Sequence, residues 1–206
     1  MKIYLLGATG RVGQRILAKA IADDHTITAL VRSPAKIKLR SDRLTPVKGD
    51  ALIEQDIFES MAGCDVVISA LNTDKNRVLS RSMPLILKAM EEHEISRIIT
   101  IGTAGILQSR SQPELYRFQS RDSKRRSTTA AEDHRDAYEI LAQSALDWTV
   151  VCPTYLPDGD EEGGYRTEVD LLPEGGKRIS VGDTAAFAYS LLFTDTNLRE
   201  RVGLAY

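Results

Sequence analysis

Six short runs of apolar and β-branched residues recur along this chain, and they constrain its fold more than any other feature. Their centres, such as "VVIS" and "WTVV", are almost continuously apolar and do not alternate with polar residues. A strand has this composition when helices cover both faces of a parallel sheet. The strands predicted on this basis cover residues 2–6, 26–31, 44–48, 65–70, 97–101 and 147–152.

Segments between these strands repeat apolar residues at helical spacing. In the first, Val12, Ile16 and Ala20 fall on one helix face, and similar stripes run through residues 79–90 and 134–145. Strand and helix therefore alternate six times. This alternation predicts a doubly wound α/β fold of the Rossmann type, with a mainly parallel sheet and helices on both faces.

The length of 206 residues suits a single domain, 1–206. After Cys152 the pattern loosens into an acidic loop at 158–164, two short strands in "EVDLLP" and "KRISVG", and a helix over 183–193 with Asp183 near its N-cap. We expect residues 154–206 to form a small C-terminal extension on the substrate side.

Charge and cysteine content exclude several classes of protein. The formal net charge of −2 gives no reason to expect nucleic acid as a partner. No apolar stretch approaches the roughly 18 residues of a membrane span, and the N-terminal apolar run is too short for a secretory signal. Cys64 and Cys152 are far apart and indicate buried thiols in a reducing compartment, so we expect a cytoplasmic protein.

No metal site is expected. The three histidines, His25, His93 and His134, fall in different predicted elements. The stretch "DGDEEG" imitates the start of an EF-hand loop, but the twelfth position is Val169 where a bidentate Glu is required.

Three glycines spaced three residues apart follow the first strand, in "YLLGATGRVGQ". A turn that ends a strand and opens a helix directs backbone N–H groups and the positive end of the helix dipole at one point. A tight strand-to-helix turn alone would also use glycines here. In the first βα unit of an α/β chain, however, the pattern favours a pyrophosphate site built from Gly7, Thr9, Gly10, Arg11, Val12 and Gly13.

The end of the second strand favours NADP(H) over NAD(H). An NAD enzyme places an acidic residue there, whereas this chain has "VRSPAK", with Arg32, Ser33 and Lys36. A guanidinium and a hydroxyl suit a 2′-phosphate, although Arg32 could also be a solvated strand-end residue. After the third strand, Asp50 could accept from the adenine amino group beside Ala51, or serve only as a turn residue.

These residues together resemble the atypical short-chain dehydrogenase/reductase superfamily, through "GATGRVG", "VRSPAK", "GDAL" and "VVISALN". The C-terminal half, including "RISVGDTAAFAYSLL", is similar to the biliverdin reductase B/flavin reductase branch, with NmrA-like proteins as neighbours. The resemblance implies an NADPH-dependent reductase whose nicotinamide lies near Ala70 and Leu71, near Thr103, and near Pro153 and Thr154.

The chain departs from the superfamily in lacking its Tyr-x-x-x-Lys pair, since Tyr138 is followed four residues later by Ala142. The departure argues against alcohol oxidation or sugar epimerisation by the usual route. Hydride transfer to a flavin demands less of the protein, which has to stack and orient two rings while solvent supplies the proton.

Candidate catalytic residues are Thr103, His134, Tyr138 and Tyr155. Thr103 follows the fifth strand and could bond the carboxamide or cap a turn. His134 and Tyr138 share a helix face and could point into the crevice, or serve only the core. The biliverdin reductase B branch has histidines at the positions of His134, Tyr138 and Tyr155. Tyr155 could stack on an isoalloxazine or close the core.

A long interruption at 105–127 carries Arg110, Arg117, Arg121, Lys124, Arg125 and Arg126. It could be a solvated face or a basic flap that attracts an anionic substrate such as a flavin phosphate or a propionate. The sequence therefore predicts a monomeric or weakly dimeric reductase whose acceptor is a flavin, quinone or tetrapyrrole-like molecule. The alternative is a regulatory protein that senses NADP(H) without turnover.

Overall fold

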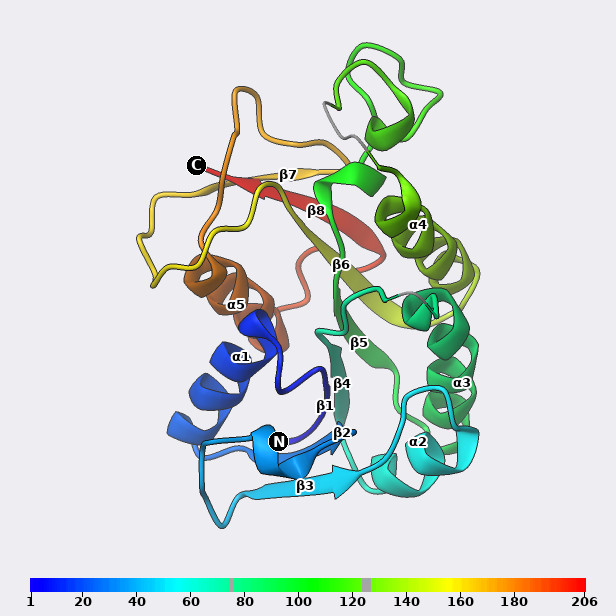
Figure 1. Ribbon diagram of the computed structural model, residues 1–206, viewed down its shortest axis with the longest axis vertical. Helices are drawn as coiled ribbons and strands as arrows, with labels where there is room; N and C mark the ends of the chain where they lie inside the picture. Colours follow the sequence, from blue (N-terminus) through cyan, green and yellow to red (C-terminus); the bar gives the residue numbers. More distant parts are fainter. Residues whose placement is uncertain (75, 124–126) are drawn as a thin grey trace.

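The computed structural model describes residues 1–74, 76–123 and 127–206, which contain a single eight-stranded sheet (Figure 1). The strand order is β3-β2-β1-β4-β5-β6-β8-β7, and every neighbouring pair is parallel except β7 and β8. The strands are β1 (Lys2–Leu6), β2 (Thr26–Val31), β3 (Leu44–Lys48), β4 (Val66–Ser69), β5 (Arg97–Ile101), β6 (Asp147–Pro153), β7 (Arg166–Val169) and β8 (Glu200–Ala205).

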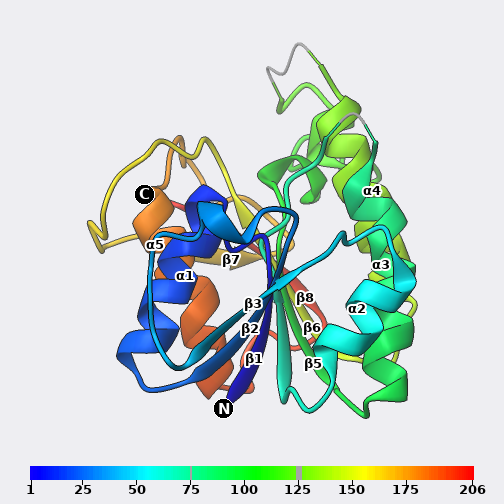
Figure 2. The same cartoon turned by 60° about the horizontal axis from the view of Figure 1, so that its bottom comes forward.

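Helices cover both faces of this sheet, as Figure 2 shows with the sheet nearly edge-on. On one face lie α1 (Arg11–Ala22) and α5 (Val181–Ser190), and on the other lie α2 (Glu54–Met61), α3 (Val78–Glu92) and α4 (Thr129–Ala142). The short turns are η1 (Pro34–Lys36), η2 (Ala104–Ile106), η3 (Arg117–Gln119) and η4 (Leu191–Phe193). The predicted doubly wound Rossmann-type fold is confirmed.

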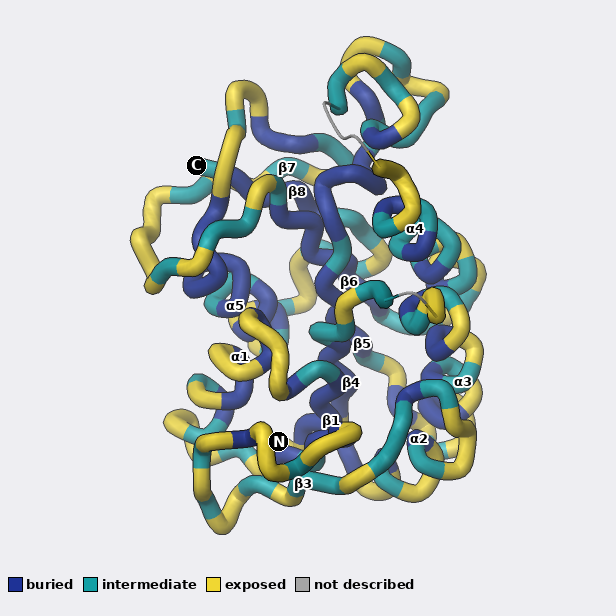
Figure 3. The backbone as a smooth tube through the Cα atoms, in the orientation of Figure 1, coloured by how far each residue is buried: buried dark blue, intermediate teal, exposed yellow. Residues whose placement is uncertain are grey.

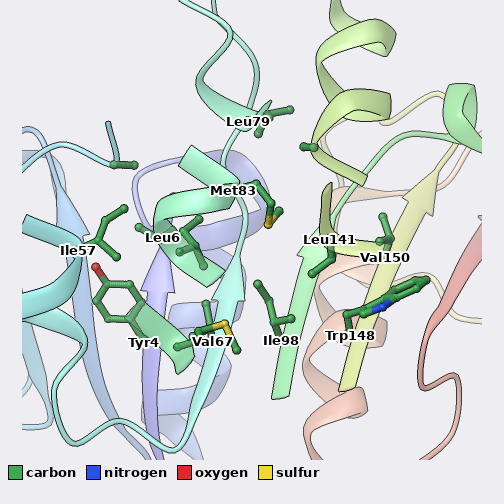
Figure 4. Packing of buried hydrophobic residues seen from close by; sticks show 14 of the residues in the cluster. Tyr4, Leu6, Ile57, Val67, Leu79, Met83, Ile98, Leu141, Trp148 and Val150 are labelled. Atoms are coloured by element: carbon green, nitrogen blue, oxygen red, sulfur yellow. The ribbon is translucent and has the colours of Figure 1, made fainter. Parts of the chain in front are cut away.

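Successive side chains of β1 explain why the strand sequences are continuously apolar. Ile3 and Leu5 pack against α1 and α5, while Tyr4 and Leu6 face the core on the α2–α4 side. Figure 4 shows the second of these cores, in which Trp148 of β6 also lies. Figure 3 shows the central strands buried, whereas the edge strand β3 and much of the outer loops are intermediate or exposed.

Four of the six predicted strands have the observed bounds. The prediction for β4 is one residue too long at each end, and that for β6 is one residue too short at its C-terminal end. The strand β8 was not predicted, and "KRISVG" supplies only one isolated bridge, between Arg178 and Tyr155. The expected alternation also fails once, because the connection from β2 to β3 contains only η1.

The C-terminal segment completes the same sheet, since β8 lies between β6 and β7. Helix α5 begins at Val181, two residues before the predicted start, because Ser180 is its N-cap and accepts a hydrogen bond from the amide of Asp183 at 2.9 Å. In the described residues no helix combines the length and the apolar character that a membrane crossing requires.

The strand order reverses direction between β1 and β4, which are direct neighbours. Their following loops leave the carboxyl edge toward opposite faces of the sheet, and ligands of doubly wound folds bind in the crevice that this divergence opens. The fold therefore brings the glycine turn after β1 and the loop after β4 to one place.

Candidate functional site

Two of the three glycines in the turn after β1 are required by the fold itself. Gly7 has φ +78°, and a Cβ there would lie 2.3 Å from the carbonyl oxygen of Ala70. A Cβ at Gly13 would lie 2.1 Å from the carbonyl oxygen of Gly7. Both positions exclude a side chain because backbone atoms already occupy the space.

Gly10 is different, because the packing of the protein explains it less well. A Cβ there would come no nearer than 3.2 Å to another atom, the carbonyl oxygen of Gly7, and Gly10 is exposed. Gly10 is also the N-cap of α1 and provides no side-chain cap for the first amides of the helix. The open backbone and the uncapped helix end suit an anion that approaches closely. Backbone atoms exclude a side chain outright at Gly7 and Gly13, whereas a side chain at Gly10 would require only a small adjustment of the turn.

A cleft of about 290 Å³ lies in front of this turn, between the loops that follow β1, β2, β3 and β4. It contains eight of the predicted cofactor-binding residues, and the others lie outside its lining. The eight are Gly7, Thr9, Gly10, Arg32, Asp50, Ala51, Ala70 and Leu71.

The predicted residues of the first helical turn take other positions. Val12 and Gly13 are buried beneath the turn, so only their backbone N–H groups are available to a ligand. The side chain of Arg11 reaches the C-terminal segment, where it donates to the carbonyl oxygen of Leu156 at 2.9 Å and to Asp158 Oδ1 at 3.0 Å.

Basic side chains lie on both sides of Thr9. Arg32 lines the cleft, and Thr9 also lines a neighbouring pocket of about 350 Å³ together with Lys36 and Lys38. Ser33 is exposed and is the N-cap of η1. The end of β2 is therefore positively charged at the point where doubly wound enzymes bind the ribose of their cofactor.

Asp50 is both a turn residue and a cleft residue. Its Oδ1 accepts from the amide of Leu52 at 3.0 Å, and its own amide donates to Asp56 Oδ2 at 2.8 Å. These bonds fix the carboxylate at the mouth of the cleft. The two interpretations of Asp50 from the sequence are compatible.

The loop after β4 supplies cleft residues that the sequence analysis missed. Asn72, Thr73, Asp74 and Asn76 line the cleft, followed by Val78 at the start of α3. A run of polar residues directly after a buried strand marks a carboxyl-edge loop, and this signal could have identified them. Thr73 donates a hydrogen bond to the buried Asp133 of α4.

Three of the four candidate catalytic residues are grouped around β5 and α4. Thr103 is buried, and its Oγ1 accepts from the amide of Gly105 at 3.3 Å as the N-cap of η2. His134 and Tyr138 line a cavity of about 20 Å³ that also touches Ser69, just before the cleft residue Ala70. Such a cavity holds about one water molecule.

Tyr138 is held mainly by packing. Its ring contacts that of Trp148 edge-on at 5.8 Å, and the guanidinium of Arg201 lies 4.6 Å from the ring centre. Burial raises the pKa of Tyr138, and the nearby charge of Arg201 opposes this only in part. A phenol with a raised pKa is a weak proton donor at neutral pH.

The fourth candidate, Tyr155, is 71% exposed, whereas the other three are buried or half-buried. It directly precedes Leu156, the residue that accepts from Arg11, so it lies on the same side of the molecule as the start of α1. Pro153 is buried at the end of β6, and the amide of Thr154 donates to the carbonyl oxygen of Leu204 at 3.4 Å.

The acidic loop 158–164 packs along α1 through ion pairs. Asp158 pairs with Arg11 at 3.0 Å, Asp160 with Arg15 at 2.7 Å, and Glu161 with Lys19 at 2.5 Å. The three bases are spaced four residues apart, so they form one stripe on the helix. Within the described residues, no group of three or more His, Cys, Asp or Glu side chains is arranged to hold a metal ion.

An acidic residue of the predicted basic flap, Asp122, binds the described residues 109–111 of the same segment. Asp122 accepts from the hydroxyls of Ser111 and Ser109 at 2.6 and 2.7 Å, and these bonds lower its pKa to about 2. Arg110 forms an ion pair with Glu168 of β7. Three of the predicted cations, Lys124, Arg125 and Arg126, lie outside the described residues.

Comparison with known proteins gives a family and several structural neighbours. The model of the NAD(P)H-binding family matches residues 7–195. A candidate epimerase from Bacteroides thetaiotaomicron is 27% identical, with a TM-score of 0.87 over 100% of this chain and 96% of that chain. A candidate NADH-flavin reductase from Streptococcus pneumoniae is 25% identical, with a TM-score of 0.83 over 100% and 99%.

A third neighbour is ChuY, an anaerobilin reductase from Escherichia coli O157:H7. It is 21% identical, with a TM-score of 0.80 over 100% of this chain and 97% of that chain. At this identity the likeness concerns the fold alone.

Proposed function

This chain belongs to the NAD(P)H-binding family, and on that premise we propose that it is an NADPH-dependent oxidoreductase that reduces a flavin or a similar conjugated acceptor. The observation that carries the proposal is Gly10. It leaves the backbone open at an uncapped helix N-terminus, in a cleft at the strand-order reversal.

The residues of the cleft fit a dinucleotide. The amides at the start of α1 and the hydroxyl of Thr9 would bind the pyrophosphate against Gly10. Asp50 would accept from the adenine amino group, and Ala51 would pack beside the ring. Ala70 and Leu71 would flank the nicotinamide, because they follow β4 at the same edge of the sheet.

The positive charge at the end of β2 supports NADPH over NADH. Arg32 would bind the 2′-phosphate together with Ser33, and Lys36 would add positive charge nearby. A carboxylate that could accept from the ribose hydroxyls of NAD does not occur in the "VRSPAK" stretch itself. A guanidinium is well matched to a phosphate in both charge and geometry.

The bound nicotinamide would supply the hydride. The chain's own contribution is orientation and exclusion of water rather than acid–base chemistry. Tyr138 has a raised pKa and is packed between Trp148 and Arg201, which makes it a poor proton donor. A flavin can take its proton from solvent, whereas alcohol or sugar chemistry needs an activated tyrosine, so the missing Tyr-x-x-x-Lys pair favours a flavin-type acceptor.

We place the acceptor beside the cleft, near Thr103, Thr154 and Tyr155, which lie outside its lining. The C-terminal part of the domain 1–206, residues 154–206, would supply this side. The exposed ring of Tyr155 offers a stacking surface for a flat conjugated molecule. The neighbour from Streptococcus pneumoniae, a candidate NADH-flavin reductase, supports the same acceptor class. Both free cysteines are buried, which fits a reducing compartment such as the cytoplasm.

One observation favours a second candidate function, an NADP(H) sensor without turnover. The cavity beside His134 and Tyr138 has a volume of only about 20 Å³, which leaves no room for an acceptor on that side of the cleft. A sensor would bind the dinucleotide and pass its presence to a partner without any acceptor site.

The decisive experiment follows NADPH absorbance with purified protein and a panel of FMN, riboflavin, quinones and biliverdin. Turnover that saturates with FMN or riboflavin supports the flavin reductase. Tight NADP⁺ binding with no turnover on any acceptor supports the sensor. Absence of both binding and turnover contradicts the two candidates together.

A further inference from the structure

A buried carboxylate on α4 joins the wall of the cleft to two helices. Asp133 has no exposed surface, and its partners lie 53 to 60 residues away in the sequence. Oδ2 accepts from Thr73 Oγ1 at 2.5 Å and from the amide of Leu79 at 3.3 Å. Oδ1 accepts from the amide of Ser80 at 3.0 Å and from Ser80 Oγ at 2.6 Å.

These bonds make Asp133 the N-terminal cap of a different helix. The N-cap residue of α3 is Arg77, which has φ +54° and provides no side-chain cap. Asp133 takes over this role from α4 by accepting from the amides of Leu79 and Ser80 in the first turn of α3. Its negative charge also lies at the positive end of the helix dipole.

The remaining bond reaches the cleft. Thr73 is one of the residues that line the cleft, and its hydroxyl is committed to Asp133. The neighbouring cleft residues Asn72 and Asp74 are carried by the same loop. A second tie between this loop and α4 is the ion pair of Arg77 with Asp136.

The cost of this arrangement indicates that it serves the site. A local Ser, Thr or Asp at position 77 would cap α3 without burying a charge from another element. A fully buried carboxylate is tolerated only when hydrogen bonds compensate for its lost hydration. Here these hydrogen bonds fix the distance between Thr73 in the cleft wall and Asp133 in α4. His134 directly follows Asp133 in α4.

We propose that Asp133 is a positioning residue, which sets the wall of the cleft on the nicotinamide side through Thr73 and thereby sets the affinity for the dinucleotide. Asp133 itself touches neither the dinucleotide nor the acceptor. The inference rests on the proposed function, because it assumes that the cleft binds NADPH.

Because Thr73 and Ser80 each donate a hydroxyl bond to Asp133, the bond to the cleft loop and a bond to α3 can be removed separately. Thr73→Val removes the hydroxyl that reaches the cleft and leaves both bonds to Ser80. Ser80→Ala removes a bond to α3 and leaves Thr73 in place. Thr167→Val is the matched control, because Thr167 is exposed on β7, at the far edge of the sheet from β3.

The test measures the dissociation constants of NADPH and NADH by fluorescence titration, and the melting temperature of each variant without ligand. We expect Thr73→Val to weaken NADPH binding about fivefold or more, and to lower the melting temperature no more than Ser80→Ala does, since each variant removes one hydroxyl bond to the buried carboxylate. Ser80→Ala should lower the melting temperature and weaken binding less. Asp133→Asn should do both, because its amide cannot accept from every donor that faces the carboxylate.

Wild-type affinity in Thr73→Val and Asp133→Asn, with a lowered melting temperature in Asp133→Asn, would overturn the inference and leave Asp133 a purely structural cap. If the wild-type protein binds neither NADPH nor NADH, the proposed function fails and the inference fails with it. If Asp133→Asn does not fold, Thr73→Val decides, because it keeps the helix cap. If turnover with FMN is measurable, the Thr73→Val change should appear in KM for NADPH more than in kcat.

Discussion

The carbonyl oxygen of Ala70 lies 2.3 Å from the point that a Cβ of Gly7 would occupy. The loops after β1 and β4 therefore meet backbone to backbone at the reversal of the strand order. This contact forms the rear of the cleft. Gly10 also lines the cleft, and a Cβ added there would meet no atom closer than 3.2 Å. The three glycines of one motif thus have two different physical purposes.

Replacing Gly10 separates these purposes. We expect Gly10→Ala to change the free energy of unfolding by about 1 kcal/mol or less, because φ is −81° and the added Cβ would press only on the carbonyl oxygen of Gly7, at 3.2 Å. NADPH affinity should fall by about tenfold or more, since the methyl group would occupy the position of the pyrophosphate. Urea denaturation and fluorescence titration measure the two quantities.

Gly7→Ala is the control for this prediction. It forces a side chain into a left-handed conformation and into Ala70, so it should lower the free energy of unfolding by about 3 kcal/mol or prevent folding. A Gly10→Ala protein that binds NADPH as tightly as the wild type would contradict the pyrophosphate site.

Replacing Arg32 tests the choice of cofactor. Arg32→Glu should weaken NADPH by about tenfold or more and NADH much less, because a charge-assisted bond to the 2′-phosphate is replaced by repulsion. Arg199→Glu makes the same change of charge one residue before β8, away from the carboxyl edge of the sheet. The specificity proposal is lost if NADPH and NADH bind equally well both before and after the Arg32 change.

Acid should destabilise the protein through two buried carboxylates. Burial opposes ionisation of Asp183, but bonds from Tyr206, the amides of Glu162 and Gly163, and Ser180 outweigh it and lower its pKa. Burial and hydrogen bonding act in the same way on Asp133. A lowered pKa in the folded state stabilises the protein above the unfolded-state value, and this stabilisation is lost as the pH falls through the folded-state value.

The free energy of unfolding should therefore decrease as the pH falls below 3.8, the ordinary pKa of an aspartate. Asp183→Asn should lower it at neutral pH and make it less dependent on pH in the acid range. Urea denaturation across a pH series measures both effects. An unchanged acid slope in Asp183→Asn would show that other groups cause the loss.

A strand could be predicted from the sequence where helices cover it on both faces of the sheet. The runs that became β1, β2, β4, β5 and β6 carry this signal in their own residues, whereas β3 is an edge strand without a buried residue. The strand β8 contains Glu200, Arg201 and Gly203, and it becomes a strand because β6 and β7 pair with it. Pairing of this kind is decided by the tertiary fold and leaves no local pattern.

The residues of the site could likewise be predicted only where their own local sequence carries the signal. The glycine turn and Arg32 depend on local geometry and charge at known positions of the fold, so the sequence indicated them. The role of Asp133 depends on partners more than 50 residues away, and no spacing rule connects it with Thr73. Likewise, the packing of Tyr138 against Arg201 requires β8, which the sequence analysis did not find.

The ion pairs between α1 and the acidic loop should contribute little to stability. Arg11 and Asp158 keep 54% and 81% of their side-chain surface exposed, and exposed pairs are worth about 0.2–1 kcal/mol each. Neutralising Asp158, Asp160 and Glu161 together should therefore lower the free energy of unfolding by about 1–2 kcal/mol at low salt. In about 1 M salt the loss should nearly vanish, because screening already removes the attraction in the wild type. Urea denaturation of both proteins at low and high salt makes the comparison. A loss that persists in high salt would mean that the carboxylates hold the loop through contacts other than charge.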